Sequence, residues 1–317
     1  MLPPKIIGAF IALIGITGGA IAAVEQSPSS HFAHLNQARY GAMAVTDGRY
    51  IYVVGGAHFA NHRIPAERID TKTGEVEILD WQPLQRRYHA AAIYDGTVWI
   101  FGGEEDGEVI GLVEKIDIKS GYQQLGPSWL APRQGTTAIV SRGGIMLLGG
   151  LASRDEQDTR GAMLEILNPT DETYFLGTDL PEPIETKAVE VGGSIYLVGG
   201  WEPDAGTSNR VYVMGEDEEW RRLADMPFAL SAHAIVSDGE FIYSFGDYED
   251  LDRVARYEIA TDKWTLIDVP YTPRRHAAAV MINDQVYVIG GNTASGGPAT
   301  TVIESYTLND LREASLR

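Results

Sequence analysis

The 317-residue chain contains no cysteine. Disulfides, zinc ribbons, iron–sulfur clusters and thiol nucleophiles are therefore excluded. Basic residues are also scarce: Lys and Arg total 25 against 44 Asp and Glu, which gives a formal net charge of −19. Such a chain lacks the basic field that binds phosphates, so we expect no nucleic-acid partner and no attraction to anionic lipid.

Familiar catalytic signatures are missing as well. The sequence has no G-x-S-x-G elbow, no H-E-x-x-H helix, no phosphate-binding loop and no dinucleotide fingerprint. His58 and His62 stand four residues apart, but in an expected loop where the helical spacing of metal ligands does not apply. We therefore expect neither a metal nor a cofactor.

Residues 1–23 have the pattern of an export signal. Lys5 gives a short positive start, residues 6–16 are mostly apolar, and the segment ends in small residues of the Ala-x-Ala type. An uncleaved membrane anchor is the alternative, although the apolar stretch is at the lower limit for a span. We predict a signal peptide over 1–23 and a single domain over 24–317. The mature protein would be periplasmic or secreted and would have no further membrane span.

The rest of the chain repeats six times. A Gly-Gly pair follows an apolar strand in five copies, Gly246 and Asp247 form a degraded sixth, and the second position recurs every 44 to 50 residues. Each copy divides into four short strands with turn residues between them. The residue three positions before the first glycine is Tyr52, Trp99, Met146, Tyr196, Tyr243 or Tyr287. The fourth strand opens near a large residue, which is Val76, Tyr122, Tyr174, Trp220 or Trp264.

The double glycine, the aromatic before it and the later Trp together resemble the Kelch repeat, over about residues 32–306. The resemblance implies an all-β fold, a six-bladed β-propeller of four-stranded blades. A single blade cannot bury both faces, and a closed ring buries them mutually. The repeated aromatics and the later Trp residues are then expected to pack between blades.

Closure of this ring can be predicted from the two ends of the chain. The sixth copy lacks a fourth strand, and the polar tail over 309–317 offers none. The segment around Phe32 resembles the pattern that begins at Trp220. We therefore expect an N-terminal strand to complete the last blade and to leave no unpaired seam.

Basic and aromatic residues gather where the innermost strands begin, a position that also includes Lys187 and His233. Converging Arg and Tyr suit a polar or anionic small ligand such as an acidic sugar. The alternative is that the arginines are structural and pair with carboxylates and carbonyls of neighbouring blades. The candidate ligand-binding residues are Arg39, Tyr40, Arg87, Tyr88, His89, Arg133, Trp201, Arg275 and His276.

Our leading hypothesis is a non-catalytic, exported Kelch propeller that binds a protein or a carbohydrate at the mouth of its central channel. The runner-up is a sugar-acting isomerase, because sialic-acid epimerases (mutarotases) are exported six-bladed Kelch propellers. Glu104 or Glu202 would then be the acid/base beside Arg87 or Arg275. Copper oxidases with Kelch repeats need a Cys–Tyr crosslink, which this chain cannot form. A third hypothesis is an envelope scaffold that uses the sides of the propeller.

Overall fold

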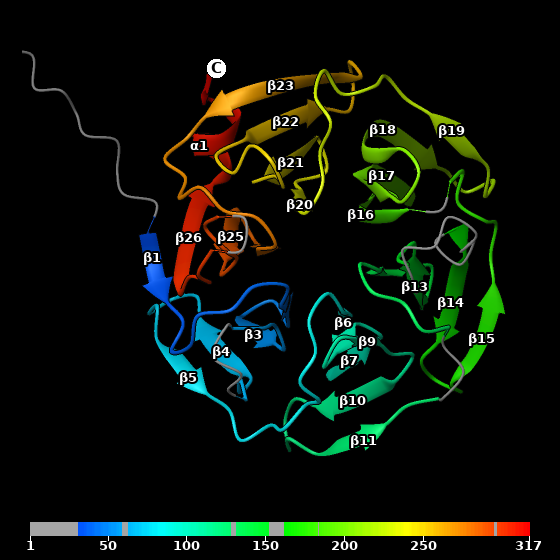
Figure 1. The fold of residues 1–317 in the computed structure, drawn as a ribbon, viewed down its shortest axis with the longest axis vertical. Helices are drawn as coiled ribbons and strands as arrows, with labels where there is room; N and C mark the ends of the chain where they lie inside the picture. Colours follow the sequence, from blue (N-terminus) through cyan, green and yellow to red (C-terminus); the bar gives the residue numbers. More distant parts are fainter. Residues whose placement is uncertain (1–30, 59–62, 128–130, 152–161, 183, 295–296) are drawn as a thin grey trace, which may run out of the picture.

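The computed structural model describes residues 31–58, 63–127, 131–151, 162–182, 184–294 and 297–317. The predicted signal peptide lies outside these residues. Six antiparallel sheets stand in a ring around a central axis, one sheet per repeat (Figure 1). The predicted six-bladed propeller is confirmed. Within the described part of the chain, no helix is long and apolar enough to cross a membrane.

Each blade contains four strands in chain order from the axis outward, apart from the last blade. Blade 1 is β2 (Met43–Thr46), β3 (Tyr50–Val54), β4 (Glu67–Asp70) and β5 (Val76–Ile78). Blade 2 is β6 (Ala90–Tyr94), β7 (Thr97–Phe101), β10 (Val113–Asp117) and β11 (Gln123–Leu125), with a small hairpin of β8 (Glu104–Glu105) and β9 (Glu108–Val109). Blade 3 is β12 (Thr137–Ser141), β13 (Gly144–Leu148), β14 (Leu164–Asn168) and β15 (Thr173–Leu176).

Blades 4 to 6 follow the same plan. Blade 4 is β16 (Glu185–Val191), β17 (Ser194–Glu202), β18 (Gly206–Met214) and β19 (Trp220–Arg222). Blade 5 is β20 (Ala234–Ser237), β21 (Phe241–Phe245), β22 (Val254–Glu258) and β23 (Lys263–Asp268). Blade 6 is β24 (Ala278–Ile282), β25 (Gln285–Ile289), β26 (Val302–Thr307) and, from the other end of the chain, β1 (His31–His34).

Strand β1 closes the ring, as the sequence predicts. It pairs antiparallel with β26, with Ala33 opposite Ile303, and the two strands lie side by side in Figure 1. The Phe32 ring packs edge-on against Tyr287 at 5.2 Å between centroids. The last blade is therefore built from both ends of the chain, which removes the open seam that an unpaired edge would leave.

The C-terminal tail does form a strand, although its polar sequence gave no indication of one. Helix α1 (Leu308–Arg312) begins with a capping box formed by Thr307 and Asp310. Strand β27 (Ser315–Leu316) then pairs with β23 as a fifth strand of blade 5. The tail thus covers the outer edge of blade 5, while blade 6 takes its outer strand from β1.

The core lies between neighbouring blades, where apolar residues of facing sheets meet. All six residues three positions before the first glycine are buried, which confirms their predicted place in the core. The later aromatic position is more varied. The later Trp residues pack as expected: Trp264 is only 8% exposed, and Trp220 is half-buried against the cluster shared by blades 3 and 4. Tyr122, which has the equivalent place in blade 2, is 66% exposed.

The Gly-Gly pair marks the junction between one blade and the next. A Cβ on Gly102 would lie 2.5 Å from the carbonyl oxygen of Arg133, and one on Gly246 would lie 2.0 Å from that of Arg274. The N–H of the second glycine donates to the next blade, as from Gly103 to the Arg133 carbonyl at 2.8 Å. No side chain fits at the first position, because the backbone of the next blade occupies that space.

Candidate functional site

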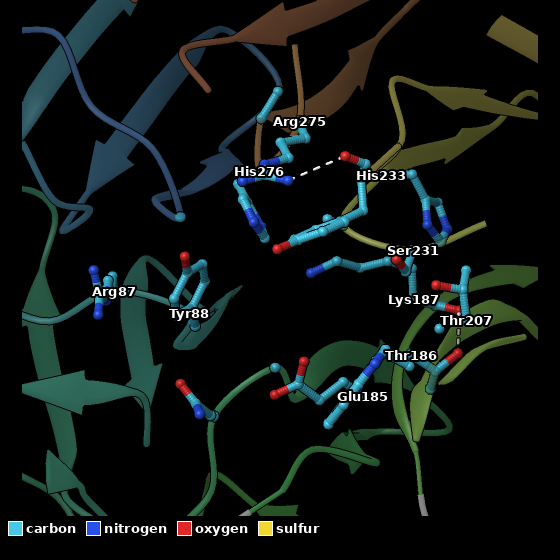
Figure 2. Close-up of a pocket in the computed structure, with 18 of the residues that line it drawn as sticks. Arg87, Tyr88, Glu185, Thr186, Lys187, Thr207, Ser231, His233, Arg275 and His276 are labelled. Carbon is cyan, nitrogen blue, oxygen red and sulfur yellow. Dashed lines mark hydrogen bonds between the residues drawn. The ribbon is translucent and has the colours of Figure 1, made fainter. Parts of the chain in front are cut away.

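An axial cavity of about 540 Å³ opens where the six innermost strands begin. Every blade contributes to its wall, and Figure 2 shows side chains from several blades pointing into it. This is the face at which the sequence places its candidate ligand-binding residues. The cavity is the place in the fold where those residues can act together on one ligand.

The backbone at the start of each inner strand directs side chains into this cavity. One residue bridges to the segment after Gly-Gly, as Arg87 does to Glu104 and Arg275 does to Asn292. The next residue has positive φ, which is +55° at Tyr88 and +53° at His276. The same backbone conformation recurs at Gly41, Gly135 and Ala232, so it is a feature of the repeat that turns the chain into the inner strand at the cavity.

Two of the candidate arginines lie elsewhere. Arg39 is fully buried and paired with Glu67, and Arg133 is equally buried and paired with Glu165, so neither lines the cavity. A buried arginine–glutamate pair of this kind recurs in four blades. In three of them the arginine also donates to the carbonyl oxygen of the first glycine of Gly-Gly. For these arginines the structural alternative applies. The four pairs are Arg39 with Glu67, Arg86 with Glu114, Arg133 with Glu165, and Arg274 with Glu304.

Arg87 faces the cavity and is held in place by two partners. Its guanidinium donates to the Glu104 carboxylate at 2.5 Å and to the Tyr40 hydroxyl at 2.6 Å. Tyr40 does not line the cavity itself but positions Arg87 at its edge. The structure therefore brings together one acid–arginine pair that the isomerase hypothesis requires, that of Glu104 with Arg87.

The second acid–arginine pair of that hypothesis does not form at the cavity. Glu202 bonds Arg210 at 3.1 Å and lies outside the cavity wall, although the neighbouring Trp201 does line it. Burial, with a contribution from Asp204, raises the pKa of Glu202 above its usual value.

Arg275 is a buried cation without an acidic partner among the described residues. It is 5% exposed, and its guanidinium donates to the Tyr248 carbonyl at 3.1 Å (Figure 2). The guanidinium also stacks on the Tyr248 ring, at 3.8 Å from the centroid. Its Nε atom has no hydrogen-bond partner. A guanidinium taken out of water with a donor to spare can take an anion as its partner.

Three imidazoles in the cavity wall are held neutral. His233 is 1% exposed and neither ring nitrogen has a partner, and burial lowers its pKa to about 3, with Lys187 adding to the effect. Burial likewise lowers the pKa of His276 to about 3, followed by the charges of Arg275, Lys187 and Arg87. His89 shifts in the same direction. The cations of several blades thus act at one place near the axis.

Other wall residues were not among the sequence candidates. Lys187 and His233 were recognised at the inner-strand position but not as binding residues, and their lack of a partner could be seen only in the structure. Glu185 precedes Lys187 by two residues on β16. Gln134 lies at the inner-strand position and Tyr248 in the loop after Gly246, where the sequence places a site, although neither was chosen as a binding residue. Thr207 and Ser231 are further polar wall residues that no sequence signal identified.

No model of a protein family matches this sequence. Among curated proteins, alpha-scruin of Limulus polyphemus is 26% identical over 160 residues, which are 46% of this chain and 17% of the relative. Kelch repeat protein M-T8 of myxoma virus (strain Lausanne) is 23% identical over 232 residues, 70% of this chain and 44% of the relative. Human Kelch-like protein 23 is 27% identical over 161 residues, 48% of this chain and 29% of the relative.

The chain therefore spans less than half the length of each of these relatives. These relatives are Kelch-repeat proteins, and the repeat is what this chain has in common with them. In this chain the repeat has the double glycine at five of six blade junctions and Gly246-Asp247 at the other, a buried residue three positions before it, and six blades in a closed ring. This chain is a Kelch-repeat β-propeller.

Proposed function

We propose that this propeller is a non-catalytic binding protein that holds a small acidic carbohydrate in its axial cavity. The observation that carries the proposal is Arg275, a buried guanidinium at the cavity wall without a carboxylate partner in the described part of the chain. A carboxylate of the ligand would provide the missing counter-charge, and a charge-assisted bond of this kind is stronger than a neutral one.

The size and chemistry of the wall support the same ligand class. A volume of about 540 Å³ lies within the range of small-molecule sites, which is roughly 300–1,000 Å³. Hydroxyl groups of Thr207 and Ser231 and the amide of Gln134 can bond sugar hydroxyls, and the Tyr88 and Tyr248 rings can pack on a sugar face.

A thermal-shift experiment tests this proposal with glucuronate as the acidic sugar and glucose as its neutral counterpart. Ligand at a hundred times its dissociation constant stabilises the folded state by about 2.7 kcal/mol. We expect a rise in Tm with glucuronate, little with glucose at the same concentration, and loss of the rise in Arg275→Met. Arg222→Met, on an exposed outer strand, removes the same charge away from the cavity and should keep the full shift. An equal shift in Arg275→Met would contradict the assigned site.

The alternative ligand is a protein that binds the same face of the propeller, because Kelch propellers typically bind proteins. The exposed rim residues Tyr248 and Glu249 stand at the cavity edge and are accessible to a large partner. If no small anion changes Tm while Arg275 variants fold normally, the small-ligand proposal fails, and the rim becomes the surface to test for protein binding.

An isomerase of the epimerase or mutarotase type is the second candidate, favoured by the contact of Glu104 with Arg87 at the cavity. A carboxylate beside an anion-holding arginine can move a proton on a bound sugar. NMR exchange spectroscopy on sialic acid measures this directly. Enhanced anomer exchange that Glu104→Gln abolishes would establish catalysis, and exchange at the uncatalysed rate would support binding alone.

Export to the periplasm or the medium remains part of the proposal. It rests on the pattern of residues 1–23, with its positive start, apolar centre and small-residue end. Expression of the full chain followed by cell fractionation and N-terminal sequencing tests it. A mature N-terminus near residue 24 in the exported fraction supports cleavage, whereas full-length protein in the cytosol contradicts it.

A further inference from the structure

Lys187 breaks the pattern of the inner strands. Its partner across the blade is Val198, the residue before Gly-Gly, and the register of the other five blades defines the same position in each. The residues at that position elsewhere are Met43, Ala90, Thr137, Ala234 and Ala278. Only blade 4 places a charged side chain there, and Figure 2 shows it crossing from the wall toward the middle of the cavity.

The Lys187 amine has no hydrogen bond or ion pair among the residues that the structure describes. An ammonium carries three donors, and one without acceptors loses much of the stabilisation that water gives to the charge. Burial therefore lowers the pKa of Lys187 below its usual value, and the attraction of Glu185 opposes this only in part. The side chain is half-buried, so the amine stays accessible to a molecule in the cavity.

Neighbouring cations act in the same direction. The charge of Lys187 lowers the pKa values of His89, His233 and His276, which places the amine within electrostatic reach of blades 2, 5 and 6. Two arginines with permanent charge, Arg87 and Arg275, line the same cavity. A lysine that is desolvated beside other cations is the kind that reacts as a neutral amine near neutral pH.

We propose that Lys187 is a nucleophile that condenses reversibly with the carbonyl group of a small oxo acid in the axial cavity. This rests on the proposed function, because Arg275 would hold the carboxylate of the oxo acid. The Nζ lone pair attacks the carbonyl carbon, a C–N bond forms, and the carbonyl oxygen takes up a proton as the nitrogen gives one away. The hydroxyl then takes the second proton of the nitrogen and leaves as water, the C–O bond breaks and a C=N double bond forms, which is the imine; addition of water reverses the reaction.

Glu185 is the group on this wall that can carry the proton between nitrogen and oxygen. It precedes Lys187 on the same strand and lines the same cavity, and both side chains are visible in Figure 2. No oxidant or reductant is consumed, because condensation and hydrolysis only exchange water.

Reductive trapping tests this proposal. The full chain is incubated with glyoxylate and cyanoborohydride over pH 6 to 9, and peptide mass spectrometry measures the labelling rate of each lysine. Lys119 and Lys263 are exposed and serve as internal controls. At pH 6.5 we expect Lys187 to be labelled at least about tenfold faster than these controls, because each unit of pKa changes the neutral fraction tenfold. The control rates should rise steeply with pH, and the Lys187 rate should not.

Two variants keep the test decisive. Lys187→Met places in blade 4 the residue that blade 1 has at that position, and Lys187→Arg keeps the charge without the nucleophile; both should abolish the fast labelling. Arg275→Met should slow labelling by glyoxylate but not by propanal, which lacks a carboxylate. Equal labelling of Lys187 and Lys119 across the pH range would overturn the proposal, even if glucuronate still raises Tm and the proposed binding function stands.

Discussion

Blades 1, 2, 3 and 6 differ from blades 4 and 5 in one buried feature. The first group carries an arginine before the inner strand, paired with a glutamate of the third strand. At the arginine position blade 4 has Ile184 and blade 5 has Leu230, both buried. Their carbonyls still accept the N–H of the preceding blade's second glycine, from Gly150 and Gly200 respectively. The blade junction therefore needs the backbone at this position, and the arginine adds a second, separate link.

The buried pair belongs to the framework, and the cavity takes residues from blades with and without it. The two blades without the buried pair provide Lys187 and His233 to the cavity wall, and the His233 ring nitrogens have no partner in the described structure. The same holds for the ring nitrogens of His89, although its blade does have the pair. The acid–arginine contacts of the two blades without the pair are different ones, Arg210 with Glu202 in blade 4 and Arg253 with Asp247 in blade 5. Blades 2 and 6 thus combine a buried pair with charged cavity residues such as Arg87 and Arg275, whereas blades 4 and 5 contribute to the cavity without that pair.

The largest expected effect comes from breaking a framework pair. Arg133→Met leaves Glu165 buried without its cation, and an unpaired buried charge costs about 3–5 kcal/mol of the free energy of unfolding. Urea denaturation followed by tryptophan fluorescence measures the loss.

The matched control removes both partners. Arg133→Met combined with Glu165→Leu leaves no uncompensated charge, so it should be clearly more stable than Arg133→Met alone. A double variant less stable than the single one would mean that the pair does more than neutralise itself, and the division between framework and site would need another basis.

The fold could be predicted from the sequence because it repeats. Five copies of a double glycine and one Gly-Asp copy, each with a large residue three positions earlier, define the blades, and the segment around Phe32 completes what the sixth copy lacks. Tyr122 shows the limit of the pattern: it lies just before β11, at the place where other copies have a Trp, but its side chain is 66% exposed. Strand β27 could not be predicted because two polar-tail residues pair only with an edge that the fold creates.

The site was predicted only in part, for a reason that adjacent residues make clear. In the dipeptides Arg86–Arg87 and Arg274–Arg275, the first arginine is a buried framework group and the second faces the cavity. A shift of one residue in a strand reverses the side on which a side chain lies. Composition shows that arginines gather there, but only the register, fixed by the blade junction, shows which of them meet a ligand.

The second-largest effect is expected on how the free energy of unfolding depends on pH. His233 has a pKa of about 3 in the folded state against 6.5 ordinarily. Between these values the unfolded chain binds more protons than the folded one, so the free energy of unfolding falls as the pH drops from about 6.5 toward 3. His233→Thr, which gives blade 5 the residue type of Thr136 and Thr186, should reduce this acid loss by on the order of 2–4 kcal/mol.

Urea titrations at a series of pH values from 8 to 4 measure the two slopes. The wild type and His233→Thr should diverge below about pH 6.5, because the variant has one proton fewer to take up on unfolding. Parallel curves would show that His233 is protonated in the folded cavity, and the view of a positive potential at the axis would be wrong.

The smallest effect is expected in blade 4, where packing replaces the ion pair. Ile184 lies in a buried cluster with Leu148 and Leu180, so Ile184→Val removes one methyl group and should cost about 0.5–1.5 kcal/mol. Its carbonyl keeps the bond to the Gly150 N–H, because that bond involves only backbone. A cost as large as that of Arg133→Met would mean that the side chain itself locks blade 3 to blade 4. The two groups of blades would then differ in chemistry but not in how strongly they depend on this position.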